Sequence, residues 1–322
     1  MRRLDKETVE LSRQARKILA NWDGAFGLDP EPEFFRGWEE MPNFEYGEDA
    51  FSPEMAWWLA ELCRLAYTPD HREVLRDKTG KLPNRSQILS ERTSFCEVHS
   101  VHKTGNHASI YRPRSGEGPT IVCFRGTSKI RQWIMNAVVR PHGWRRFRLD
   151  TDPDSAFVHS GFYVLFKRVW SQMEAELEAL PRPWIFTGHS LGGALAMIAG
   201  AVVEAELVCT FGTPKVGNSD FCRLKSGRRV WRLVNDMDIV PRLPLADGRL
   251  KERQYIHGFE AMKLVSPAMI TKFDSSALED ELPFSLSNLS DDIQSPPDWI
   301  LDHRIGEYCS RLRGAVLARM HD

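Results

Sequence analysis

Hydrophobic and polar positions divide most of the chain into short β-rich runs and longer helical patterns. The runs rich in β-branched and aromatic residues fall at 94–101, 107–113, 120–126, 184–190, 207–214, 230–236 and 253–259. Helical patterns fall at 52–67, 162–180 and 191–205. The first of these has Ser52 as a plausible N-cap and Pro53 at the first helical position.

The later runs alternate strand with helix, which predicts a mostly parallel central sheet with helices on both faces. In such sheets, functional groups gather at the carboxyl ends of the strands. Residues 1–50 combine a charged amphipathic helical pattern with Pro-, Gly- and Glu-rich sequence, and they are predicted to form an N-terminal extension. Residues 51–322 are predicted to form one α/β domain.

Composition narrows the class of protein. The chain has 43 basic and 44 acidic residues, so a global electrostatic attraction to nucleic acid is not expected. No apolar run approaches the length of a transmembrane helix, and the N-terminal residues lack the apolar core of a signal peptide. Six cysteines without paired or metal-binding spacing favour a reducing compartment, here the cytoplasm, although leaderless export stays open. Neither a metal nor a cofactor is expected, and the oligomeric state is left open.

A candidate nucleophile lies where a predicted strand meets a predicted helix. Residues 188–192 read Gly-His-Ser-Leu-Gly, a G-x-S-x-G pattern that is common by chance. Its context is more specific, because an apolar strand precedes it and a small-residue helix follows it. Gly188 and Gly192 would relieve crowding in so tight a turn, and Ser190 would project above the helix N-terminus. An ordinary strand–helix turn with a capping serine is the alternative.

A serine nucleophile needs a base and an orienting acid, which in this fold follow it along the chain. Among the later histidines, His321 is close to the C-terminus and His257 falls inside a predicted strand. His303 lies in a Pro-rich loop that opens an apolar-faced helix, a good position for a catalytic imidazole. The alternative is that Asp302 or His303 caps this helix.

Two aspartates end the run at 230–236 and are candidates for the acid. Asp238 precedes an apolar Ile-Val-Pro segment and lies in the turn after the strand. Asp236 fits a turn former or a solvated carboxylate better. Asp238 is therefore the preferred acid.

Six ordered motifs now give a family resemblance. They read FRGTSKIRQWI, VHSGF, GHSLGGALA, FGTPKVGN, NDMDIVPRLP and DHRIGEY, and together they resemble the class 3 (fungal-type) triacylglycerol lipases of the α/β-hydrolase superfamily. The resemblance implies Ser190 as nucleophile, Asp238 as acid and His303 as base. It further implies an oxyanion hole formed by Thr127 and the backbone N–H of Leu191. The chain departs from the family at Asn136, often an aspartate there, and in a long acidic, Ser-rich stretch over residues 260–300.

Directly after Thr127, residues 129–139 have one apolar helical face. Ile130, Trp133, Ile134 and Val138 lie on it, and the resemblance implies a lid helix over the serine. An ordinary core helix is the alternative. The arginines and aromatics that follow, over 140–148, suit an anionic lipid interface and a solvated loop about equally.

These features predict a serine carboxylic-ester hydrolase, in first place a lipase that acts on acylglycerols and takes a lipid ester as its substrate. A phospholipase A1 that cleaves diacyl phospholipids is the alternative within the same chemistry. A relative that binds lipid or a protein partner without catalysis is the alternative from another class. No sequence feature favours a peptidase.

Overall fold

The structure is a computed structural model, and it describes residues 33–47, 50–68, 76–77, 80–81, 84–103, 106–126, 141–144, 152–224, 229–244, 255–266, 269–273 and 298–321. The helices described are η2 (Trp38–Glu40), α2 (Pro53–Leu65), α3 (Arg85–Arg92), α5 (Ser160–Trp170), α6 (Glu174–Glu178), α7 (Leu191–Val202), α8 (Ser219–Arg223), η3 (Val240–Arg242), α9 (Asp298–Leu301) and α10 (Ile305–His321). The strands described are β1 (Arg76–Asp77), β2 (Gly80–Lys81), β3 (Phe95–Lys103), β4 (Asn106–Pro113), β5 (Thr120–Phe124), β6 (Pro141–Gly143), β7 (Phe157–His159), β8 (Trp184–His189), β9 (Leu207–Phe211), β10 (Arg229–Asn235), β11 (Ala261–Ser266) and β12 (Met269–Phe273).

Within these residues, eight strands form the central sheet, in the order β12-β11-β10-β9-β8-β5-β4-β3. Strands β5, β8, β9, β10 and β11 pair in parallel, whereas β12, β4 and β3 pair antiparallel with their neighbours. Strand β8 lies between β5 and β9, with Gly188 opposite both Phe124 and Thr210. The carboxyl end of β8 therefore opens in the parallel part of the sheet, where functional groups of such folds gather.

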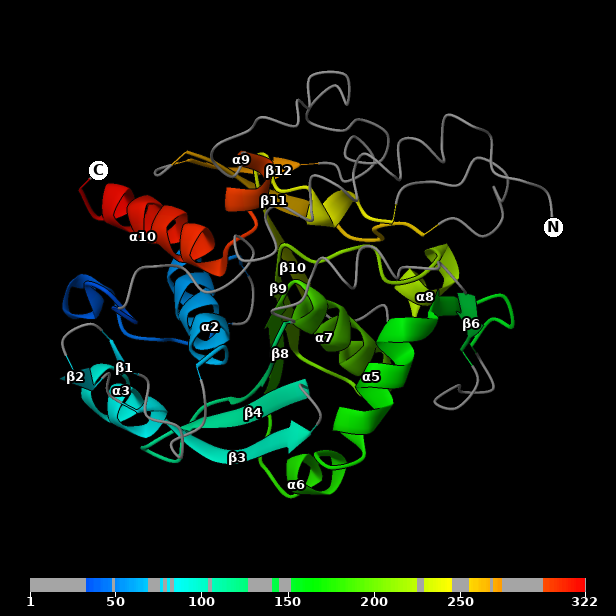
Figure 1. Ribbon diagram of the computed structural model, residues 1–322, viewed down its shortest axis with the longest axis horizontal. Coiled ribbons are helices and arrows are strands. Elements are labelled where there is room, and N and C mark those ends of the chain that lie inside the picture. Colours follow the sequence, from blue (N-terminus) through cyan, green and yellow to red (C-terminus); the bar gives the residue numbers. More distant parts are fainter. Residues whose placement is uncertain are drawn as a thin grey trace.

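Helices cover both faces of the sheet, as the alternation of strand and helix patterns predicted (Figure 1). Helices α2 and α10 lie on one face and α5 and α7 on the other. Strand β5 shows how the sequence supplies both cores: Ile121 and Cys123 pack toward α2 and α10, and the alternating Val122 and Phe124 pack toward α5 and α7. A strand buried on both faces explains why β5 reads as an unbroken apolar run.

Helix α2 begins as the sequence predicted. The hydroxyl of Ser52 accepts a hydrogen bond from the N–H of Met55 at 3.0 Å, and Pro53 occupies the first turn. Part of the predicted N-terminal extension packs beside this helix: Phe34 and Phe35 are buried in the same core. The division of the chain at residue 50 stays a prediction.

Three segments differ from the sequence-based expectation. The single helix expected over 162–180 is two helices, α5 and α6, separated by a turn at 171–173. The strand expected over 253–259 is irregular in its described part, except for an isolated bridge between Ile256 and Gly217. Strands β11 and β12 lie in the stretch described as acidic and Ser-rich, for which no strand was predicted, while 274–297 lie outside the described residues. No helix in the described ranges is long and apolar enough to cross a membrane.

Candidate active site

Ser190 occupies a sharp turn between β8 and α7. Its backbone has φ 58° and ψ −125°, a conformation that residues with a Cβ rarely adopt. The turn is held because the N–H of Ser190 donates to the carbonyl of Phe211 at 2.9 Å. The serine is fully buried, and its hydroxyl has no hydrogen-bond partner among the described residues. A strained serine at the junction of a strand and a helix is the geometry of a nucleophile elbow.

Glycines make this turn possible through close backbone approach. A Cβ on Gly192 would lie 1.9 Å from the carbonyl oxygen of Phe124, and one on Gly188 would lie 2.3 Å from the carbonyl carbon of Gly192. A Cβ on Gly193 would lie 1.8 Å from the hydroxyl of Thr213. The sequence argument that these glycines relieve crowding therefore agrees with the contacts.

Asp238 and His303 form a buried pair although 65 residues separate them. The Nδ1 of His303 lies 2.9 Å from each carboxylate oxygen of Asp238. Because a carboxylate only accepts, Nδ1 carries the proton and Nε2 is left as the basic nitrogen of the neutral ring. The N–H of Val240 also donates to Asp238, at 2.9 Å. This is the arrangement that an acid needs to orient a general base.

Tyr308 and Gly212 complete the surroundings of the pair, and sequence reasoning did not find them. The hydroxyl of Tyr308 donates to Oδ2 of Asp238 at 2.6 Å and accepts the N–H of Asn235 at 3.0 Å. Burial and the negative charge of Asp238 raise the pKa of Tyr308 well above its usual value, which keeps it a donor. Gly212 has φ 56°, and a Cβ there would lie 2.6 Å from Asp238 Oδ2. The sequence signals were a Tyr one turn into α10 and a Gly directly after β9.

His189 connects the elbow with the base. Its Nε2 lies 2.7 Å from the backbone carbonyl of His303, and its Nδ1 lies 2.8 Å from the hydroxyl of Tyr67. A carbonyl cannot donate, so Nε2 carries the proton and Tyr67 donates to Nδ1. Burial lowers the pKa of His189 well below its usual value, and repulsion from His303 whenever that ring is protonated acts in the same direction, so the neutral ring of His189 is favoured. The rings of His189 and His303 lie 4.7 Å apart, so the residue before Ser190 contacts the proposed base.

The alternative residues lie elsewhere. Asp236 forms an ion pair with Lys263 and is partly exposed. His257 is partly buried and lies 2.6 Å from the carbonyl of Pro241, and its pKa is lowered by desolvation and by the charge of Arg232. The reason given for setting His257 aside was wrong, because it lies in an irregular segment rather than inside a strand. His321 is exposed at the end of α10.

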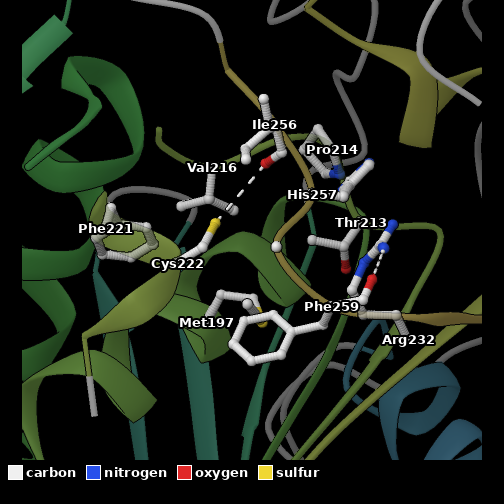
Figure 2. A pocket seen from close by; sticks show the side chains of 11 residues that line it. Met197, Thr213, Pro214, Val216, Phe221, Cys222, Arg232, Ile256, His257 and Phe259 are labelled. Carbon is white, nitrogen blue, oxygen red and sulfur yellow. Dashed lines mark hydrogen bonds between the residues drawn. The ribbon is translucent and has the colours of Figure 1, made fainter. Parts of the chain in front are cut away.

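His257 also lines a small cavity on the α7 side of the sheet (Figure 2). Most of its lining is apolar and comes from α7, α8 and the segment 256–259. Arg232 closes one side by donating to the carbonyl of Phe259 at 2.8 Å. Ser190, Asp238 and His303 are not part of the lining, so this cavity is not where the proposed chemistry takes place. Within the described ranges, no cluster of three His, Cys, Asp or Glu residues could hold a metal ion.

Several predicted site residues lie outside the described residues. They are the oxyanion residue Thr127 and the lid residues Ile130, Trp133, Ile134 and Val138. Leu191 is described: it is the first residue of α7, directly after Ser190, and it is buried. The structure thus brings Asp238 and His303 together and places Ser190 and Leu191 at the adjoining elbow.

Comparison with known proteins agrees with this geometry. The solved structure of a lipase from Rhizopus microsporus var. chinensis matches with a TM-score of 0.54 and 23% identity, covering 76% of this chain and 85% of that one. The central sheet and the helices on its two faces are those of the α/β-hydrolase fold. Residues 121–248 match the model of the family described as Lipase (class 3). This region of the chain is similar to the class 3 lipases.

Two curated relatives extend the comparison. Secreted mono- and diacylglycerol lipase 2 of Gibberella zeae is 26% identical over 200 residues, which cover 51% of this chain and 48% of that protein. Phospholipase A(1) DAD1, chloroplastic, of Arabidopsis thaliana is 29% identical over 155 residues, 41% of this chain and 35% of that protein. The chain therefore spans half the length or less of these two relatives.

Proposed function

We propose that this protein is a serine carboxylic-ester hydrolase, and in first place a lipase that acts on acylglycerols. The observation that carries the proposal is the strained Ser190 turn beside a fully buried Asp238–His303 pair. Strained backbone persists only where the surrounding structure enforces it, and it is concentrated at functional sites. A capping serine in an ordinary turn would not need this conformation.

The chemistry would run through an acyl-enzyme. The Nε2 of His303 takes the proton from the Ser190 hydroxyl as its oxygen attacks the ester carbonyl. Asp238 orients the ring and stabilises the imidazolium, which then gives its proton to the departing alcohol. A water molecule, deprotonated by the same nitrogen, releases the fatty acid and regenerates Ser190. The N-terminus of α7 beneath the serine favours the negative charge that develops on the carbonyl oxygen.

The family resemblance supports two further parts of the proposal. Thr127 and the N–H of Leu191 would bind the oxyanion, and residues 129–139 would form a lid over the serine. The burial of Ser190 agrees with a site that needs an opening step before a lipid ester can enter. A lipid surface that buries the apolar lid face would favour that opening.

The acylglycerol assignment rests on the class 3 lipase match and on the lipase relatives. Phospholipase A1 activity is the second candidate, because a relative with that name matches 41% of the chain. A binding protein without catalysis is disfavoured, since a strained serine and a buried acid–base pair would then be maintained at a cost in stability without any return in chemistry.

Replacement of the nucleophile tests the proposal directly. Ser190→Ala is expected to lower ester hydrolysis by about three to six orders of magnitude while leaving thermal unfolding nearly unchanged. Ser90→Ala, at an exposed position of α3, is the matched control and should keep full activity. A fluorophosphonate probe should label the wild type and not Ser190→Ala. Retention of more than about a tenth of the activity in Ser190→Ala would contradict the assignment.

A substrate panel separates the two candidates. Mono-, di- and triacylglycerols and a diacyl phospholipid of the same acyl chain are presented in matched mixed micelles, and the released fatty acids are quantified. A lipase should give a higher kcat/KM on the acylglycerols. Preference for the phospholipid, with release from the sn-1 position, would instead favour phospholipase A1.

A further inference from the structure

Asp302, the residue directly before His303, has a buried carboxylate that reaches across to the acid. Its Oδ2 accepts the backbone N–H of Met237 at 2.9 Å, and Met237 directly precedes Asp238. Its Oδ1 pairs with the guanidinium of Arg311 on α10. Asp302 thus precedes the proposed base in the chain, and its carboxylate is hydrogen-bonded to the residue that precedes the proposed acid.

The backbone of the same residue makes a second connection. The carbonyl of Asp302 accepts the side-chain amide of Asn235 at 2.8 Å, and Asn235 ends β10 just before the turn that carries Asp238. The N–H of Asp302 donates to the carbonyl of Asp298 at 2.7 Å, which ties it to α9. Two residues of the turn 235–238, Asn235 and Met237, are therefore hydrogen-bonded to Asp302.

Arg311 anchors this carboxylate to the sheet. Its Nη1 donates to the carbonyl of Leu264 on β11 at 2.9 Å, while its Nη2 holds Asp302. The pKa of Asp302 is raised on balance, because burial raises it more than the Met237 N–H and Arg311 lower it. A buried carboxylate with both oxygens engaged restricts the movement of whatever it joins.

We propose that Asp302 is a positioning residue, whose carboxylate keeps the turn that carries Asp238 in register with His303. This inference rests on the proposed function, in which Asp238 orients His303 as the base. Its physical basis is that the pair comes from segments far apart in the chain, so that their separation depends on tertiary contacts. A shift of about 1 Å at a catalytic pair can lower the rate about 100-fold.

A role as an ordinary helix cap is the alternative for Asp302. A cap acts on the stability of α10, whereas a positioning residue acts on the His303–Asp238 hydrogen bond. The two roles are separated by measurements that report on that hydrogen bond and on turnover per correctly folded site.

The test compares Asp302→Ala, Asp302→Asn and the control Asp298→Ala, an exposed carboxylate on the neighbouring α9. Active sites are counted with a fluorophosphonate probe, and kcat and KM are measured per active site. Asp302→Ala should lower kcat about 10- to 100-fold with KM nearly unchanged, since both contacts of the carboxylate are lost. Asp302→Asn, whose amide oxygen can still accept the Met237 N–H, should lose about three- to tenfold. Asp298→Ala should match the wild type.

A second readout does not depend on activity. Proton NMR follows the strongly deshielded Nδ1 proton of His303, which its bond to Asp238 produces. The signal should disappear or move far upfield in Asp302→Ala, and remain in Asp302→Asn and Asp298→Ala. Should the wild type hydrolyse no ester, the proposed function fails, and this signal still decides whether Asp302 positions the pair.

Two results would overturn the proposal. One is a wild-type kcat per active site with an unchanged His303 signal in Asp302→Ala. The other is a lowered melting temperature with an unchanged signal, which would make Asp302 a helix cap. If Asp302→Ala does not fold, Asp302→Asn decides, and a wild-type kcat in that variant would overturn the proposal.

Discussion

At the nucleophile elbow, Ser190 is held by close backbone packing, whereas at the acid–base corner, formed by 235–238 and 302–308, Asp238 and His303 are held by side-chain hydrogen bonds. The elbow depends on glycine backbones that pack against adjacent strands. The corner depends on buried side-chain hydrogen bonds from Tyr308, Asp302 and His189. The two regions therefore differ in what damages them: added volume damages the elbow, and removal of a polar group damages the corner.

The same difference predicts how substitutions act in the elbow and in the corner. A backbone contact at the elbow leaves no room even for a methyl group, so substitution there should act on folding as a whole. A hydrogen bond at the corner can be removed by an isosteric change that leaves packing intact, so substitution there should act on turnover more than on stability. Three substitutions test this difference, and a fourth tests a histidine outside both regions.

The largest effect is expected at the acid. Asp238→Asn keeps the shape of the side chain but cannot stabilise the imidazolium or enforce the ring orientation, so kcat/KM should fall about 10⁴-fold. Asp236→Asn, which only loses a partly exposed ion pair with Lys263, should stay within about threefold of the wild type. Steady-state kinetics on one soluble ester measure both variants. Equal losses would mean that the acid is wrongly assigned.

The next effect is expected at the elbow and on stability. Gly192→Ala would place a methyl group 1.9 Å from the carbonyl oxygen of Phe124, and we expect a loss of about 2–4 kcal/mol in the free energy of unfolding. Gly47→Ala is the control, because nothing lies within 4 Å of its Cβ position. Urea unfolding followed by fluorescence gives both values. If the two variants are equally stable, packing at the elbow is looser than the contacts imply.

A smaller effect is expected when one hydroxyl is removed from the corner. Tyr308→Phe removes one of the donors to Asp238 and leaves the Asn235 N–H without its acceptor, which should lower kcat about tenfold and stability by about 1–3 kcal/mol. Tyr255→Phe is the matched control, because the Tyr255 hydroxyl is buried without a hydrogen-bond partner among the described residues. Its removal should be neutral. A neutral Tyr308→Phe would show that the corner does not depend on this bond.

The smallest effect is expected on stability at acidic pH, and it concerns a histidine outside both regions. Burial lowers the pKa of His159 to about 4, so the unfolded chain binds a proton that the folded chain does not bind between about pH 6.5 and pH 4. Stability should therefore fall as the pH falls through this window. His159→Asn, which can still accept the Gly161 N–H, should reduce the slope by up to about 1.4 kcal/mol per pH unit.

Urea unfolding at several pH values between 4 and 7 measures that slope. An unchanged slope in His159→Asn would mean that other histidines with lowered pKa values, such as His189 and His257, cause the dependence of stability on pH. The native activity at pH 7 should be the same in the variant and the wild type.

Sequence reasoning reached different depths in the two regions, for a physical reason. The elbow is encoded locally: an apolar strand, three nearby glycines and a small-residue helix are visible in residues 184–202. The acid and base could be nominated from their places after a strand and before a helix. Their supporting contacts could not be predicted, because Tyr308, His189 and the carboxylate of Asp302 approach this part of the chain only through tertiary packing.

The fold shows the same limit. The alternation of strand and helix patterns predicted the parallel sheet and the helices on its two faces, because strands and helices have different hydrophobic periods. Strands β11 and β12 were missed because mixed polar sequence, such as Met-Ile-Thr-Lys-Phe in β12, carries little of the apolar signal of a buried strand. The strand expected over 253–259 was wrong for its described residues, 255–259, because they form an irregular segment that packs on α8 rather than pairing in the sheet.

The packing of α10 against α2 on one face of the sheet has a consequence for synthesis (Figure 1). A ribosome releases the strand and helix that carry Ser190 well before residues 298–321, which supply His303 and Tyr308. A growing chain with a folded elbow thus lacks its proposed base until α10 docks beside α2. If Ser190 and His303 act as proposed, hydrolysis requires this last packing step, and a chain stalled before residue 298 would present the serine without its base.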